Sequence, residues 1–566
     1  MIDSTLPVAR ASSPSNQMIR RASSEANNMA SQTVARRDWS PDAGCGSAAP
    51  SGGQPGDVSH HSPGGLQSGI LSQRAGLQPL GRTPLHRKAL FRGRRLFLCG
   101  IVAFLGGCTL APKYERPAAP VAPIYPNGLA SSGQSAAEIE WQQMFVDTKL
   151  RTVIRMALEN NRDLRVAALN IEKARAQYRI QRAALIPDIN VTASGTEQRQ
   201  PGGLAFFDSS YSLGVGVSAY ELDLFGRVRS LKDAALQSYL STVETRRATH
   251  ISLVAEVASA YVTLAADEEL LRLADDTLRT RQQAYDIQNK RYAAGTSSLL
   301  ELRQADGELE DARSTALAAT SQVALDRNAL ELLVGSPLAP DLLPVAGATT
   351  AMLGRDDLPA GLPSDLLRNR PDILAAEHDL MGANANIGAA RAAFFPSISL
   401  TGSVGRASLE LKDLFDGGNH TWSFSPQINL PIFTGGRLKA DLDVSKANRD
   451  IAVAQYEKSI QTAFREVADA LAQRAVMDAR LEAQRRRSDA AGISNDLVQR
   501  RYREKVAGYL EVLDAQRTAY VARQSFIQTD LARQMNLITL YKVLGGGWDP
   551  GLSNRPDPNT SAKHTG

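Results

Sequence analysis

An internal duplication at a spacing of 209 residues constrains this 566-residue chain more than any other feature. The segment ARAQYRIQRAALIPDINVTASG (174–195) reappears as ANANIGAARAAFFPSISLTGSV (383–404), with no gap between the two copies. Identical positions include Asp163, Arg182, Ala183, Ala184, Pro187, Thr192 and Ser194, which recur as Asp372, Arg391, Ala392, Ala393, Pro396, Thr401 and Ser403. In each copy an Ala-rich helical stretch ends near a Pro, and alternating apolar and polar residues follow. We therefore expect the same switch from helix to strand twice in one chain.

The helical stretches are too long for a compact domain. Residues 228–291 contain no Pro and no Gly, and apolar residues recur every seven positions, as Val257, Leu264, Leu271, Leu278 and Tyr285. This heptad pattern predicts a coiled coil of about 95 Å. A partner helix is expected at about 299–334, after a turn at 293–298. Further helices are expected from Trp141 to about Leu185 and, in the second copy, at about 364–393, 436–490 and 494–544.

Four segments alternate small polar and apolar residues, which is typical of transmembrane β-strands. They lie at about 187–198, 211–223, 396–406 and 421–432. An open four-stranded sheet leaves backbone groups of its edges unsatisfied in lipid, and the smallest bacterial barrels have about 8 strands. The chain must therefore oligomerise to close a barrel. A soluble β-sandwich is the alternative, which the helix lengths disfavour.

The N-terminal part has the features of an exported lipoprotein. Residues 1–86 are rich in Ser, Gly and Pro and predict a disordered extension, or a start codon placed too far upstream. Residues 87–107 combine a basic segment with a short apolar run, as a secretory signal does. The run ends in Leu-Gly-Gly-Cys108, which resembles the bacterial lipobox. We expect covalent lipid on Cys108, export to the outer membrane because Thr109 follows, and an extended Pro-rich tether over 108–140.

Charge and motifs exclude several functions. Residues 1–107 carry 12 Lys and Arg against 5 Asp and Glu, so the net charge of +5 resides in the leader and gives no argument for nucleic acid. Cys45 and Cys99 have no partner spacing, and the seven His are scattered, so no metal site is expected. No nucleotide-binding loop and no catalytic constellation appears, so an enzyme is not expected.

Together these features resemble the outer membrane efflux family, the TolC-like channels, in its lipid-anchored branch serving tripartite drug-efflux pumps. The resemblance covers about 141–548 and includes ELDLFGR (221–227), LPIFTGGR (430–437) and LGGGW (544–548). It implies a mainly α fold with a transmembrane β part: a long coiled-coil barrel and four strands per chain, completed as a 12-stranded barrel in a homotrimer. The first repeat would span 141–345, the second 346–548, and 549–566 would be a disordered tail.

A second internal echo indicates where the channel is closed. RYAAGTSSLLE (291–301) recurs as RYREKVAGYLE (501–511), and both segments are expected at helix-to-helix turns. By resemblance these turns form the periplasmic tip. Tyr502 would hydrogen-bond the acid Glu301, and Glu511 and Asp514 would form an acidic ring. The family's basic latch residue falls at Ala507, so Arg503 or Lys505 would have to replace it. The turns expected to contact an adaptor are Ala294, Gly295, Thr296 and Ser297, and Val506, Ala507 and Gly508.

The resemblance implies a passive exit duct in the outer membrane of a Gram-negative bacterium, with its helical tunnel in the periplasm. Its partners would be a periplasmic adaptor, an inner membrane RND pump and outer membrane lipid, with no cofactor beyond the lipid on Cys108. Two alternatives stay open at this point. One is a duct for type I protein secretion, and the other is a lipid-anchored coiled-coil scaffold or adhesin.

Overall fold

The computed structural model describes residues 109–126, 136–199, 207–347, 352–354, 358 and 363–548. Cys108, the predicted signal segment 87–107, the extension 1–86 and the tail 549–566 lie outside the described residues. All described residues belong to one compact unit, His86–Gly566.

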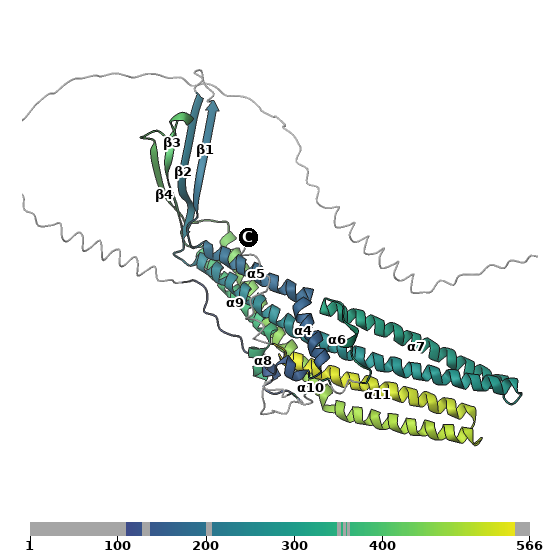
Figure 1. Ribbon diagram of the computed structural model, residues 1–566. Helices are drawn as coiled ribbons and strands as arrows, with labels where there is room; N and C mark the ends of the chain where they lie inside the picture. Colours follow the sequence, from purple (N-terminus) through teal and green to yellow (C-terminus); the bar gives the residue numbers. More distant parts are fainter. Residues whose placement is uncertain are drawn as a thin grey trace, which may run out of the picture. The chain divides into compact units, whose positions relative to one another are not determined.

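Each half of the chain contains long helices and two strands, and these elements follow one another in the same order in both halves (Figure 1). The first half contains η1 Ala136–Glu138, α3 Trp141–Met144, α4 Thr148–Asn160, α5 Arg162–Ala183, β1 Ile189–Arg199, β2 Phe207–Leu222, α6 Arg227–Ala293, α7 Leu299–Val334 and η2 Pro340–Leu342. The second contains α8 Pro363–Asn369, α9 Pro371–Ala392, β3 Ser397–Ser408, η4 Leu411–Asp413, β4 His420–Asn429, α10 Arg437–Arg503 and α11 Tyr509–Val543. Thus α5, β1, β2, α6 and α7 correspond to α9, β3, β4, α10 and α11.

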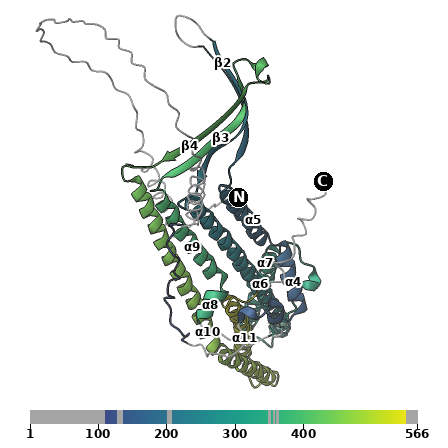
Figure 2. The same cartoon turned by 90° about the vertical axis from the view of Figure 1, so that its left-hand side faces the viewer.

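The four strands form one antiparallel sheet in the order β1-β2-β3-β4 (Figure 1). Figure 2 shows β2, β3 and β4 of this sheet from another side. The central pair joins the two copies, with Val215 opposite Val404. Small residues allow this pair to approach closely, since a Cβ at Gly216 would lie 2.6 Å from the carbonyl oxygen of Gly402. A bulge follows Val217, where Ala219 adopts φ 53°. In the sheet, β1 and β4 are the two edges, and every residue of β4 is exposed.

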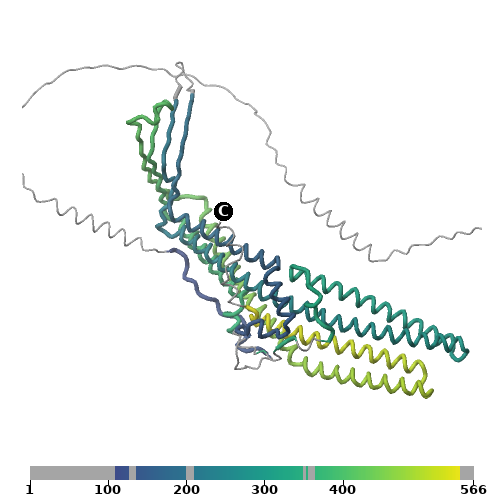
Figure 3. Tube along the Cα trace, viewed as in Figure 1, coloured from purple at the N-terminus to yellow at the C-terminus, as the bar shows by residue number. Residues whose placement is uncertain are grey.

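Two helical hairpins, α6–α7 and α10–α11, pack against each other through α6 and α11 (Figure 3). Both α6 and α10 have 67 residues, about 100 Å of helix. Each begins after a Gly in the left-handed region, Gly226 with φ 75° and Gly436 with φ 85°. One stretch of α6 is long and apolar enough to cross a membrane, but 61% of it is buried, as in a core helix.

Several predicted helix boundaries are wrong. The expected helix 364–393 is divided at Arg370 into α8 and α9, and the loop 504–508 interrupts the expected helix 494–544. We expected a break between 490 and 494, but α10 continues through Gly492 to Arg503. A single Gly costs a helix only about 1 kcal/mol, and the packing of α10 along α11 outweighs that. We also expected one helix from Trp141 to Leu185. The chain instead turns at Asn161, whose side chain accepts a hydrogen bond from the N–H of Leu164 and so begins α5.

The largest hydrophobic core lies where helices of both halves meet. It contains α4, the middle of α6, the ends of α7 and α11, α9 and part of α10. Trp141, Tyr261, Tyr456 and Tyr541 are its largest fully buried side chains. This core joins the middle of α6 and part of α10 to the C-terminal ends of α7 and α11, while the hairpin loops lie many helical turns away.

The N-terminal segment 109–126 is bound to the helices rather than free. We expected an extended tether, and it has no helix or strand, but its side chains pack on α9 and α10. Arg116 forms two hydrogen bonds of 2.7 Å with the buried Glu377 of α9. Tyr114 donates to the same carboxylate at 2.9 Å, and the Tyr125 ring stacks on Phe464 at 5.1 Å. The segment therefore acts as a strap along the second copy.

Candidate functional site

The two hairpin loops have nearly the same backbone. In the first, tip 1 (294–298), Gly295 has φ 71°, and the N–H of Thr296 donates to the carbonyl of Arg291 at 2.8 Å. In the second, tip 2 (504–508), Lys505 has φ 64°, and the N–H of Val506 donates to the carbonyl of Arg501 at 2.9 Å. The left-handed position costs a side-chain-bearing residue about 1–2 kcal/mol. Tip 2 therefore keeps a Lys in a backbone conformation where tip 1 has a Gly.

Most of the predicted tip residues are on the surface. Ala294, Gly295, Thr296, Val506 and Gly508 are exposed, and Ser297 is half-buried. Ala507 is only 9% exposed, so its side chain is not on the outer surface of tip 2 in this chain. Because Ala507 is small and carries no charge, it cannot act as a basic latch. The exposed cations at this level include Lys505 in tip 2 and Arg503 at the end of α10.

Tyr502 connects the two hairpins beside the tips. Its hydroxyl oxygen accepts hydrogen bonds from Nε2 of Gln288 at 3.0 Å and from Nη1 of Arg291 at 2.5 Å. The Arg291 guanidinium also lies 5.9 Å from the centre of the Tyr502 ring. Gln288 is 1% exposed, so its bond to Tyr502 is largely shielded from water. The second hairpin is thus held to α6 of the first at this level.

The resemblance led us to expect a direct hydrogen bond between Tyr502 and Glu301. The structure of the single chain does not show this bond. Within one chain, the Glu301 carboxylate accepts a hydrogen bond from the hydroxyl of Ser297. That hydroxyl also lies 3.2 Å from Oε1 of Gln288, the residue that donates to Tyr502. Tyr502 and Glu301 are therefore connected through Gln288 and Ser297, because the amide side chain reaches the tyrosine from α6.

The predicted ring acids lie together at the start of α11. Glu511 and Asp514 are three residues apart, hence on one helix face, and both are exposed. Oε1 of Glu511 accepts from the N–H of Gly508 at 3.0 Å and so caps the helix, and Arg501 lies 3.9 Å from its other oxygen. Glu511 thus has a structural role in capping as well as a place beside the tip.

Sequence reasoning missed Gln288 and its neighbours, although the heptad pattern contained a signal. If Leu278 and Tyr285 occupy the first core position of the heptad, the second core position is three residues later. There α6 has Asp267, Ala274, Arg281 and Gln288, so three of four successive positions are polar where Ala or Leu would be ordinary. Polar groups at such positions specify a partner and a register. All three face neighbouring helices in the structure.

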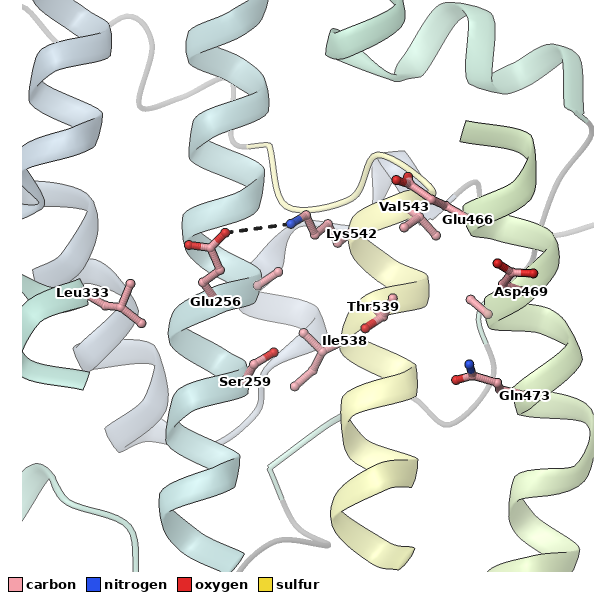
Figure 4. Close-up of a pocket in the computed structure, with 12 residues that line it drawn as sticks. Glu256, Ser259, Leu333, Glu466, Asp469, Gln473, Ile538, Thr539, Lys542 and Val543 are labelled. Atoms are coloured by element: carbon pink, nitrogen blue, oxygen red, sulfur yellow. Dashed lines mark ion pairs between the residues drawn. The ribbon is translucent and has the colours of Figure 1, made fainter. Parts of the chain in front are cut away.

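No described group resembles a catalytic or metal centre. No cluster of three or more His, Cys, Asp and Glu suited to a metal ion occurs among the described residues. A groove of about 560 Å³ lies between α6, α10 and α11, with Lys542 3.9 Å from Glu256 and with Glu466 and Asp469 opposite (Figure 4). It is open, and its chemistry is that of an acidic surface crossed by one ion pair.

The comparison with known protein families finds the same duplication, since one family model matches the chain twice. The model of the family "Outer membrane efflux protein" matches residues 153–336 and 362–546. The chain belongs to the outer membrane efflux protein family. The recognition made from motifs is therefore confirmed, together with the fold class and the outer membrane location.

The relatives are efflux components. The chain is 48% identical to the toluene efflux pump outer membrane protein TtgC of Pseudomonas putida, over 80% of this chain and 96% of that protein. It is 47% identical to the outer membrane protein OprJ of Pseudomonas aeruginosa, with the same coverages. Among solved structures, the open state of the Neisseria gonorrhoeae MtrE outer membrane channel is 43% identical and superposes with a TM-score of 0.73, covering 78% of this chain and 98% of that one. This chain is the outer membrane channel component of an efflux system.

Proposed function

We propose that three copies of this chain form a passive exit duct that takes small toxic compounds from an inner membrane RND pump through a periplasmic adaptor. The observation that carries the proposal is a four-stranded sheet with two open edges, β1 and β4. Such a sheet is not stable in lipid until its edge N–H and C=O groups are paired. Three chains in a ring pair every edge and give twelve strands.

The duplication indicates how neighbouring copies meet. Phe225, after β2, stacks on Phe395, before β3, with ring centres 4.7 Å apart. The corresponding residue after β4 is Phe433, which is 90% exposed, and the counterpart of Phe395 is Ile186, which is 68% exposed. If the second copy of one protomer meets the first copy of the next as the two copies meet within a chain, Phe433 covers Ile186 of the next protomer. Both exposed apolar groups then become buried.

Cysteine cross-linking tests the trimer. Phe433→Cys with Ile186→Cys, treated with a short bismaleimide in detergent, should give a covalent trimer in a denaturing gel. The matched control is Phe225→Cys with Phe395→Cys, which should cross-link within one chain and leave a monomer. A monomer from the first pair, with the control reacting, would overturn this arrangement of protomers.

We infer that the hairpin tips close the duct. Tyr502 bound to Gln288 and Arg291 supports this, because these bonds hold the second hairpin against the first. Glu301, through Ser297, supports the same contact, and Glu511 and Asp514 in three copies would favour cations at the opening. Tyr502→Phe and Glu301→Ala should each raise the closed-state conductance in a planar bilayer. Unchanged conductance in both variants would contradict the assignment.

Two further parts of the proposal rest on sequence. Lipid on Cys108 would anchor the strap to the membrane, and Cys108→Ser should abolish fatty-acid labelling and leave an unprocessed precursor. Small toxic compounds are the proposed cargo because of the names of two relatives from Pseudomonas putida. They are the toluene efflux pump outer membrane protein TtgC and the antibiotic efflux pump outer membrane protein ArpC. A deletion strain should become more susceptible to solvents and antibiotics, whereas loss of a secreted protein instead would favour the type I secretion duct.

A further inference from the structure

Below the tips, a buried cation joins three helices. Arg281 of α6 is 6% exposed. Its Nη1 donates to Oε1 of Gln516 in α11 at 2.5 Å, and its Nη2 lies 3.2 Å from Oε2 of Glu308 in α7. A single guanidinium therefore ties the second hairpin to both helices of the first. Its planar set of donors suits such a junction, which the compact ammonium of a Lys would not span.

The space between this junction and the tip is filled by a small apolar cluster. Ala305, Tyr509 and Leu513 are buried there, with Tyr285 and Tyr502 packed against them. Tyr509 is only 8% exposed, and this burial raises its pKa. Arg281 lies seven residues from Gln288 on the same face of α6, about 10 Å along the helix. The tip contact and the Arg281 junction are thus two separate fastenings of the same pair of hairpins.

The two fastenings differ in what it takes to break them. At the tip, Tyr502 and Arg291 are half-buried, so water can replace the hydrogen bond between them when they part, whereas Gln288 is 1% exposed and keeps its contact with Ser297. At Arg281, separation of α11 from α6 would break a hydrogen bond from a guanidinium that is only 6% exposed, and such a charge-assisted bond is stronger than a neutral one. The tip should therefore open while the Arg281 junction stays bonded.

We propose that Arg281, with Gln516 and Glu308, is the positioning group that sets how deep the opening of the duct extends. It rests on the proposed gate at the tips. When the duct opens, the part of α10 and α11 between the level of Arg281 and tip 2 moves away from α6. The part of both helices on the other side of that level remains fixed. The next tie between α6 and α11 is Glu269 with Arg523, at 3.0 Å and twelve residues further on, about 18 Å along α6. Loss of the Arg281 junction would let the opening extend to that second tie.

Single-channel conductance of the purified trimer tests this with variants that leave every charge in place. Gln516→Ala removes the bond to α11 but keeps the Arg281–Glu308 pair, so the fold should be retained. The single variant Tyr502→Phe should also raise the closed-state conductance. The double variant Tyr502→Phe/Gln516→Ala should raise it by about tenfold more than the product of the two single effects, as for coupled contacts in one hinge.

A swap distinguishes positioning from simple weakening of the structure. Arg281→Gln with Gln516→Arg exchanges the two groups of this contact between α6 and α11 and leaves the net charge unchanged. On the Tyr502→Phe background this swap should restore the conductance of Tyr502→Phe alone. Arg523→Gln is the matched control at the lower tie and should leave conductance unchanged while the Arg281 junction is intact. Thermal denaturation of each trimer monitors folding.

The outcomes separate this inference from the gate itself. A double variant equal to the product of the single effects, or a swap that fails to restore conductance in a trimer of unchanged thermal stability, would overturn the role of Arg281. If neither Tyr502→Phe nor Glu301→Ala changes the conductance, the tip gate is wrong, and the single variant Gln516→Ala then tests Arg281 by itself. A rise in conductance supports Arg281 as the restraint of the duct, and no rise overturns it.

Discussion

The duplicated helices α5 and α9 have 22 residues each, but they are buried to very different extents. Ten residues of α9 are buried, against two of α5. The reason is their neighbours: α9 packs between α6 and α10, whereas α5 packs against α6 alone. Because α10 is the counterpart of α6, α10 of another copy would supply the neighbour that α5 lacks. The difference teaches that, in the proposed trimer, assembly would complete the first half of the chain.

The side chains on these faces have changed in a matched way. His378 of α9 lies 2.8 Å, from Nδ1 to Oε1, from Gln237 of α6. The counterparts are Leu169 and Ala447, and Leu169 is 54% exposed. A polar contact inside the chain thus corresponds to an apolar contact across the proposed seam between protomers. Both partners changed polarity together, as a contact requires.

The largest effect should come from the strap, which binds α9 and has no counterpart on α5. Glu377 is 3% exposed and depends on Arg116, while the duplicated position is Ala168. Arg116→Met should lower the free energy of unfolding by about 3 kcal/mol, because a buried carboxylate loses its cation. Denaturant titration measures this. Arg116→Met with Glu377→Met should recover most of the loss, and equal losses in both variants would show that the charge pair is not the cause.

Transplanting the polar pair across the seam should have the next largest effect. Leu169→His or Ala447→Gln alone places a polar group against an apolar one and should weaken the trimer by about 1–2 kcal/mol. The double variant recreates the contact of His378 with Gln237 and should regain part of that loss. Light scattering over a dilution series measures trimer dissociation. Additive losses in the double variant would mean that the two copies meet differently across the seam.

The hairpins also differ in their titration. Burial and a hydrogen bond with Asp326 raise the pKa of Asp267 to about 7, while the counterparts in the second hairpin are Met477 and Asn536. Between pH 4 and 7 the folded chain holds a proton that the unfolded chain has lost, so Asp267 reduces stability as the pH rises. Asp267→Met should therefore raise the melting temperature at pH 8 more than at pH 5.

Glu269, two residues further along α6, provides the control for that pH dependence. Its hydrogen bonds with Arg272 and Arg523 lower its pKa, so its contribution is present above its unfolded pKa and is lost as the pH falls. Glu269→Gln should lower the melting temperature at pH 8 and have less effect in acid. A gain from Asp267→Met that is the same at both pH values would contradict the raised pKa.

The smallest effect should be at the tips, where the backbone is the same and the residue differs. Lys505→Gly should stabilise the chain by about 0.5–1 kcal/mol, because Gly has no Cβ to strain the left-handed conformation. Gly295→Lys should destabilise it by a similar amount, since nothing else lies within 4 Å of the new Cβ. Calorimetry of the two trimers measures both. Changes of the same sign would mean that the tips are not equivalent in backbone energy.

Local patterns were enough for much of the fold. The helix-to-strand switches, the four strands and the loop of the first hairpin lie close to where periodicity and turn residues indicated, because each depends on neighbours in sequence. The loop of the second hairpin was indicated by the echo at 501–511 and not by the helical pattern. The turn at Asn161 and the continuity of α10 through Gly492 were not predictable in the same way. Both depend on packing against distant helices, which outweighs single-residue preferences.

The candidate site also has a part that the sequence indicated and a part that depends on how the hairpins pack. The sequence indicated Tyr502, Glu301 and the two tips through their echo at a spacing of 210 residues. It did not indicate that Gln288 and Ser297 lie between Tyr502 and Glu301, since side-chain reach depends on how the hairpins are packed. Arg281 was visible only as a charge at a core position of a heptad. Its partners on α7 and α11 lie 27 and 235 residues away along the chain.

The sequence by itself determined the elements of this protein: two copies of a strand pair and a long hairpin, with an open sheet that cannot exist alone in lipid. Periodicity and duplication are local or repeating properties, so one chain is enough to reveal them. The tertiary structure alone decided which copy is covered, where the strap binds, and which buried groups join the hairpins. Those depend on the relative positions of side chains hundreds of residues apart, and burial then determines the energy of each contact.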